Sequence, residues 1–252
     1  KELSNYLNID LFEIYKQKKL SSKNLSLREK LKISKIYFLR VFFDLIHKKD
    51  VSFDFCFLIL KSLLNLNLSI FNLIFKKGNR NLKSLKHLEI ESLVARKHIK
   101  AWEHFLKSKK EIMVIFEDDT ICKKDSKKRL KDLFKSLRNI DLDNTFIDLA
   151  GGLKQNDVIP KRKIKNFQGE FLIVKGIYTN TACSYLINRN LIKLLYEEYQ
   201  RSNLNNSFPI DHLINKLGLN LKSTHNIFSM HFKNPLFTHG SFKANIKSWQ
   251  NY

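Results

Sequence analysis

Residues 112–122 read IMVIFEDDTIC, an apolar run followed at once by three carboxylates. The five apolar residues predict a buried β-strand. Open α/β sheets bind ligands at the carboxyl ends of their strands, so the triplet stands where a ligand is expected. Alternation along a strand puts Glu117 and Asp119 on one face and Asp118 on the other.

Three adjacent carboxylates repel one another unless a cation or hydrogen-bond donors neutralise them. A hard divalent ion, Mg²⁺ or Mn²⁺, bridged to a diphosphate would do so. The alternative reading of residues 117–119 is a solvated acidic turn after a strand, which is common in α/β proteins.

Helices and strands alternate on both sides of this run. Apolar residues at three- and four-residue spacing predict an amphipathic helix over residues 85–107. Further helices are predicted at residues 126–137, 189–199 and 210–217, the last closed by Gly218, and strands at 145–150, 171–174 and 182–187. This alternation indicates an α/β sandwich.

The N-terminal part has a different pattern. Residues 27–48 and 53–77 show helical apolar spacing, so we expect a helical N-terminal region over 1–84 and a catalytic region over 85–252. The most apolar stretch, 51–75, is interrupted by Asp, Lys and Asn residues and is not expected to cross a membrane. It is an interfacial helix or a buried one.

The formal net charge of +22 comes from 46 Lys and Arg against 24 Asp and Glu. Such an excess favours nucleic acid, an anionic membrane surface or acidic substrates as partners, although A+T-rich codons also supply many lysines. Three widely separated cysteines form neither a disulfide framework nor a zinc site, and the chain opens without a signal-peptide pattern. We therefore expect a cytoplasmic protein.

A second pattern precedes the triplet. Residues 97–102 read KHIKAW, and IMVIFEDD follows after a short spacer. In order and spacing this resembles the bacterial family 25 glycosyltransferases, which have a Ser-His-x-x-x-Trp helix, an apolar strand and Glu-Asp-Asp; Lys97 stands at the Ser position. The segments TACSYLINR at 181–189, Pro-Ile-Asp at 209–211 and NPLFTHGSFKANI at 234–246 also resemble the family. The family's opening nucleotide-binding strand has no clear copy in residues 1–87.

The resemblance implies a GT-A-like, Rossmann-type sandwich that uses Mn²⁺ or Mg²⁺. It implies transfer of a hexose, galactose favoured, from a UDP-sugar to a lipopolysaccharide or other surface-glycan acceptor, with inversion. Expected partners are the UDP-sugar, a saccharide or lipid-linked saccharide, and the anionic inner face of the cell membrane; nucleic acid is not favoured, because its binding motifs are absent. The alternatives are a basic nucleic-acid-binding protein and a catalytically degenerate relative.

Site residues are carried over on the same basis. The expected metal ligands are Asp119, Glu117 and His239. Donor-binding residues are Glu117, Asp118, His98, Ser241 and Lys243, and acceptor-binding residues are Tyr178, Asn180 and Thr181. Asp211 is the expected base that takes the acceptor's proton, or else an ordinary first-turn acid favoured by the helix dipole. Trp102 is expected to pack in the core.

Overall fold

The computed structural model describes residues 64, 79–137, 144–151, 164–168, 170–179, 181–202 and 208–240. The chain divides into two compact units, and the unit that includes residues 97–203 and 211–240 holds both β-sheets. We call it the sheet unit. The described part of the other unit comprises Leu64, the first part of helix α4 and residues 208–210. The helices predicted at 27–48 and 53–77 lie outside the described residues, Leu64 apart.

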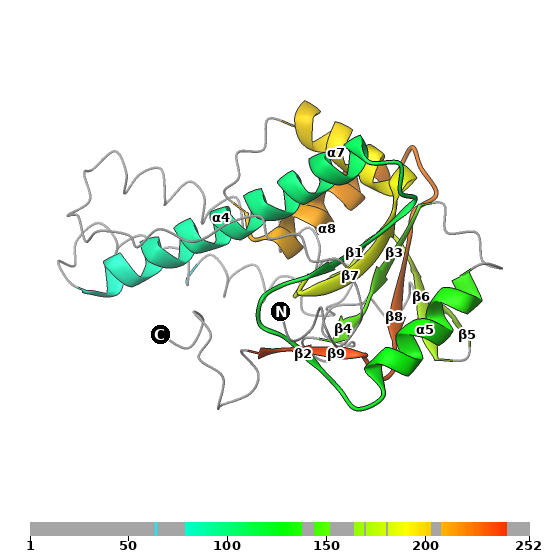
Figure 1. Ribbon diagram of the computed structural model, residues 1–252. Coiled ribbons are helices and arrows are strands. Elements are labelled where there is room, and N and C mark those ends of the chain that lie inside the picture. The colour runs from blue at the N-terminus through cyan, green and yellow to red at the C-terminus, as the bar shows by residue number, and fades with distance from the viewer. Residues whose placement is uncertain are drawn as a thin grey trace. The chain divides into compact units, whose positions relative to one another are not determined.

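A six-stranded mixed sheet forms the centre of the sheet unit, in the order β1-β7-β3-β8-β6-β5 (Figure 1). In that order the strands are β1 Ile112–Phe116, β7 Ser184–Asn188, β3 Thr145–Asp148, β8 Phe228–Phe232, β6 Phe171–Lys175 and β5 Ile164–Gln168. Strands β3 and β8 run parallel, and the other neighbouring pairs run antiparallel.

A second sheet of three short strands has the order β2-β9-β4, formed by Thr120–Cys122, Phe237–His239 and Ala150–Gly151. The single strand predicted over 145–150 is therefore wrong. It breaks at Leu149, whose N–H donates to the Ser184 carbonyl and whose carbonyl accepts the N–H groups of Leu236 and Phe237. The chain passes from one sheet to the other at this residue.

The apolar run at 112–116 forms β1 with the predicted bounds, but the strand is only half buried. It lies at the edge of the large sheet, where β7 is its one neighbour among the strands that the structure describes. Ile112, Val114 and Phe116 nevertheless pack against the main apolar cluster, which explains why an edge strand reads as a core strand.

Helices cover both faces of the large sheet. Leu130, Leu133 and Leu137 of α5 (Ser126–Leu137) pack in one cluster with side chains of β7 and β8. On the opposite face, Trp102 of α4 (Asn79–Lys107) is fully buried beside Tyr185 of β7. Helices α7 (Arg189–Arg201) and α8 (Ile210–Leu221) are joined by the bond from the Asn220 amide to Glu198.

Helix α5 has the predicted bounds, whereas α4, α7 and α8 are present with ends that differ from the predicted ones. Strands β2, β5, β8 and β9 were not predicted. The architecture is a mixed α/β fold, and no helix in the described part of the chain has the length and apolarity needed to cross a bilayer.

The prediction that Gly218 ends α8 is wrong, because this residue lies inside the helix. Its role is a close approach, because a Cβ at this position would lie 2.8 Å from the Cβ of Ile177. The missing side chain lets the helix pack directly on the segment that follows β6.

We expect Gly218→Ala to lower the free energy of unfolding by about 1 kcal/mol, because overpacking costs ~1–3 kcal/mol and the gain in helix propensity is ~1 kcal/mol. In an Ile177→Gly background, which removes the Cβ, Cγ1 and Cδ1 atoms that the new Cβ would meet, the crowding is relieved, and the same substitution should stabilise the protein by ~1 kcal/mol. Urea unfolding of the four proteins measures both effects. An effect of the same sign in both backgrounds would contradict this explanation.

Candidate metal and donor site

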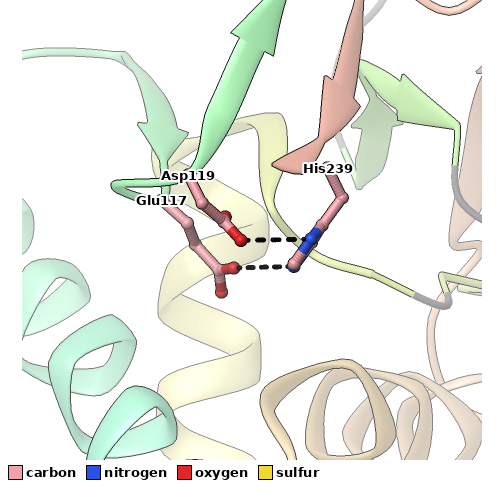
Figure 2. Close-up of side chains that lie close together, drawn as sticks. All are labelled: Glu117, Asp119 and His239. Atoms are coloured by element: carbon pink, nitrogen blue, oxygen red, sulfur yellow. Dashed lines mark ion pairs between the residues drawn. The ribbon is translucent and has the colours of Figure 1, made fainter. Parts of the chain in front are cut away.

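The acidic triplet lies in a tight turn between β1 and β2. The Glu117 N–H donates to the Cys183 carbonyl at 2.8 Å, and the Thr120 N–H donates to the Glu117 carbonyl at 3.1 Å. Glu117 and Asp119 point to the same side, as predicted (Figure 2). Asp118 is exposed. The turn produces this arrangement, whereas we had expected it from strand alternation.

Pairing of the small sheet brings His239 to these carboxylates. Thr120 of β2 lies opposite His239 of β9, and the Gly240 N–H donates to the Asp119 carbonyl at 2.9 Å. The two ring nitrogens of His239 face different acids: Nδ1 lies 3.2 Å from Asp119 Oδ2, and Nε2 lies 3.6 Å from Glu117 Oε2 (Figure 2). Ligand atoms of all three residues lie within 4.8 Å of one another. The structure thus brings the three predicted metal ligands together.

His98 and Tyr185 form a second layer behind Glu117. His98 Nε2 lies 3.2 Å from Glu117 Oε1, and His98 Nδ1 lies 2.9 Å from the Tyr185 hydroxyl, which also accepts the Trp102 indole N–H at 3.0 Å. Since the indole is only a donor, the Tyr185 proton is available for His98 Nδ1, and a neutral His98 protonated on Nε2 satisfies every contact. Trp102 packs in the core as predicted. His98, expected as a donor-binding residue, contacts a predicted metal ligand directly.

Burial and charge act in opposite directions on the three clustered groups. Burial would raise the pKa of Glu117, but hydrogen bonds with His239 and His98 outweigh it and lower the pKa from 4.5 to about 2. Burial raises the pKa of Asp119, assisted by the neighbouring Glu117 charge and opposed by His239. Burial would lower the pKa of His239, yet Glu117 and Asp119 hold it above the ordinary histidine value. The cluster therefore favours a positive charge between its carboxylates.

A buried polar network at the end of β3 was missed by sequence reasoning. Asp148 Oδ1 accepts the Ala150 N–H at 3.1 Å, and Asp148 Oδ2 accepts the Thr179 hydroxyl at 3.3 Å and lies 3.6 Å from His231 Nδ1. His231 Nε2 lies 3.2 Å from the Ser229 hydroxyl. The signal was present, because residues 145–148 also form an apolar strand that ends in an acid. Asp148 therefore links the point at Leu149 where the chain passes between the two sheets to the segment around Thr179.

The segment that follows β6 is held in place at Thr179 by a side chain of α8. The Asn215 amide of α8 accepts the Thr179 N–H at 2.8 Å and donates to the Thr179 carbonyl at 2.7 Å. Tyr178 is buried against Leu172 and Val174, and the Thr181 hydroxyl is buried with no hydrogen-bond partner among the described residues.

Asp211, the predicted base, is half buried in the first turn of α8, where its carboxylate accepts the His212 N–H at 2.9 Å. It is not a member of the Glu117–Asp119–His239 cluster. The predicted site residues Asn180, Ser241 and Lys243 lie outside the described residues.

The lowered pKa of Glu117 predicts a pH-dependent contribution to stability. A carboxyl whose pKa falls from 4.5 to about 2 on folding contributes on the order of 3 kcal/mol above pH 4.5, and this is lost as the pH falls through about 2. We expect metal-free wild type to exceed Glu117→Gln in stability by about that amount near neutral pH and the difference to shrink with acid. Urea unfolding across this range tests it; a pH-independent difference would contradict the ionic role.

Residues 95–214 match the family model of glycosyltransferase family 25, described as an LPS biosynthesis protein. The curated proteins contain no match to the chain. His98, residues 117–119 and Asp211 fall inside the matched segment, and His239 falls beyond it. The resemblance seen in the sequence is thereby confirmed. The chain carries a glycosyltransferase family 25 domain over residues 95–214 and is a glycosyltransferase.

Proposed function

We propose that the protein transfers a hexose, galactose in preference, from a UDP-sugar to a lipopolysaccharide or other surface-glycan acceptor, with inversion and with a divalent metal. The family supports the reaction class and the acceptor class. The observation that carries the proposal is the convergence of Glu117, Asp119 and His239 within 4.8 Å beside β1. A mixed sheet with helices on both faces and a small sheet at the acidic turn supports a GT-A-like fold.

The chemistry of the donor set fits Mn²⁺ better than Mg²⁺. Two carboxylates and one imidazole suit Mn²⁺, whereas Mg²⁺ prefers an all-oxygen octahedral shell. A bound cation would neutralise the charge that develops on the departing diphosphate. Glu117 is divided between two partners, Oε1 toward His98 and Oε2 toward His239. His98 would thereby orient Glu117 toward the cation.

The proton on His239 competes with a metal for the same site. Imidazole binds metals only in its neutral form, and the two carboxylates raise the pKa of His239. A protonated His239 would balance Glu117 and Asp119 in the metal-free protein, and its ring would have to lose that proton before it could hold a cation. Asp118, exposed beside them, adds negative charge to the same turn.

On the acceptor side, we assign Asp211 as the base that takes the proton from the attacking hydroxyl. Its place supports the assignment, because it lies one helical turn before Asn215, which holds Thr179. Thr181 would offer its hydroxyl to the acceptor, with Asn180 beside it and Tyr178 packed behind. Ser241 and Lys243, which follow His239 closely in the sequence, are proposed to meet the donor diphosphate.

Binding of UDP should require both Mn²⁺ and the clustered acids. We expect Asp119→Asn and Glu117→Gln each to weaken Mn²⁺-dependent UDP binding by roughly a hundredfold, since each removes a charged ligand. Isothermal titration with and without Mn²⁺ measures this. Asp132→Asn, which changes an exposed acid of α5, is the matched control and should bind like wild type. Equal UDP affinity without Mn²⁺ would sink the proposed metal role.

Asp211→Asn should separate chemistry from binding. A positioned base contributes about 10²–10⁴-fold to rate, so we expect transfer from UDP-galactose to lipopolysaccharide acceptors to fall by that factor. The affinity for UDP with Mn²⁺ should stay within a few-fold, since Asp211 lies outside the metal cluster. Rate and affinity falling together would instead assign Asp211 a structural role at the start of α8.

A further inference from the structure

We propose that one side of α5, formed by Lys127, Lys128, Lys131, Phe134 and Lys135, docks the protein on an anionic lipid surface. We call these five residues the lysine stripe. The inference deepens the proposed function, because a lipid-linked acceptor would be met at such a surface. It rests on that function only for its purpose; the docking itself is a binding property that can be measured without any transfer.

The stripe is a continuous surface. At 100° per residue, its five members fall within about one third of the helix circumference. Lys128, Lys131, Phe134 and Lys135 are exposed, and Phe134, at 37 %, is one of two large apolar side chains that are exposed among the described residues. The apolar side of the helix, with Leu130, Leu133 and Leu137, is buried in the core cluster.

Contacts on the other flank of α5 fix the direction in which the stripe faces. The Arg129 guanidinium donates to the Glu170 carboxylate at 2.9 Å and to the Asn234 carbonyl at 2.8 Å, and it lies 5.4 Å from the centre of the Phe232 ring. Arg129 projects from the side of the helix opposite the stripe. These contacts prevent the helix from rolling, so the lysines stay turned away from β6 and β8.

The positive charge of the stripe does not help the helix to form. Lys127 and Lys128 lie in the first turn, which contains no acid and where the helix dipole disfavours cations. Lys127, Lys131 and Lys135 follow one another at four-residue spacing, at which like charges repel. An exposed pair of Lys135 with Asp132 at 3.8 Å offsets little of this. A polyanionic surface would remove both penalties at once.

The composition of the stripe favours a bilayer over a nucleic acid. Its cations are all lysines, whose long stems can lie along an apolar surface while the ammonium groups reach lipid phosphates. A single exposed Phe beside them suits insertion at the boundary of headgroups and acyl chains. Nucleic-acid sites rely more on arginine, which pairs with phosphate in a bidentate way.

The position of α5 gives the stripe a purpose. The Ser126 hydroxyl at the start of α5 donates to the Leu236 carbonyl, and three-residue β9 leads from there to His239. At ~3.3 Å per residue, the helix begins roughly 10 Å from the metal cluster. An acceptor whose lipid lies in the bilayer would meet the site within the reach of a few sugar rings.

The test compares two triple variants with the same loss of charge. Co-sedimentation uses vesicles of phosphatidylcholine alone and of phosphatidylcholine with phosphatidylglycerol. Wild type should bind the anionic vesicles, and Lys128→Gln/Lys131→Gln/Lys135→Gln should bind roughly a hundredfold more weakly, from about fivefold per lysine. The matched control, Lys107→Gln/Lys109→Gln/Lys193→Gln, removes three exposed lysines at the ends or outer faces of α4 and α7 and should bind within a few-fold of wild type.

Two further measurements complete the test. Phe134→Ala should weaken vesicle binding a few-fold. This loss should be the same at low and at high salt, because salt screens charges and not apolar contacts. Equal losses of vesicle binding in both triple variants, or no binding of wild type to anionic vesicles, would overturn the proposal. Binding of duplex DNA is measured on the same proteins. If the Lys128→Gln/Lys131→Gln/Lys135→Gln variant lost DNA binding and kept vesicle binding, the stripe would be a nucleic-acid site instead. Both triple variants should keep wild-type UDP affinity with Mn²⁺, so failure of docking and failure of the proposed function can be told apart.

Discussion

Two half-buried carboxylates that share one side of a turn repel each other, so both stay ionised only when positive charge or hydrogen-bond donors lie beside them. Glu117 and Asp119 are held in this way, with His239 favouring the positive charge and His98 donating its Nε2–H to Glu117. His239 arrives from β9 and His98 from α4, so a turn of three residues binds the edge of the large sheet, the small sheet and a helix into one assembly.

The sequence was informative where a feature is local. The strand at 112–116, helix α5 and the grouping of Glu117 with Asp119 could be predicted because each depends on side-chain period or on adjacent residues. His239 was included among the ligands through resemblance to a family. Strands of two or three residues such as β2, β4 and β9 are too short to show an apolar period, so their pairing could not be predicted. They form because their neighbours hold them.

The failures have the same origin. An edge strand reads as a buried one when half of its side chains still pack on the core, as those of β1 do. Gly218 reads as a helix end because sequence cannot show that Ile177 will occupy the space. Asp148, His231 and Thr179 are far apart along the chain, and only the parallel pairing of β3 with β8 brings the first two into register. Non-local contacts therefore decided what could not be predicted.

The switch at Leu149 has a mechanical consequence. Its N–H is bonded to β7 in the large sheet, and its carbonyl is bonded to the start of β9 in the small one. The small sheet therefore cannot rock on the large one without breaking buried backbone hydrogen bonds. His239 and the turn that it faces behave as one stiff piece, which suits an enzyme that must hold a leaving group still. Any opening that admits the donor must come from segments outside this braced junction.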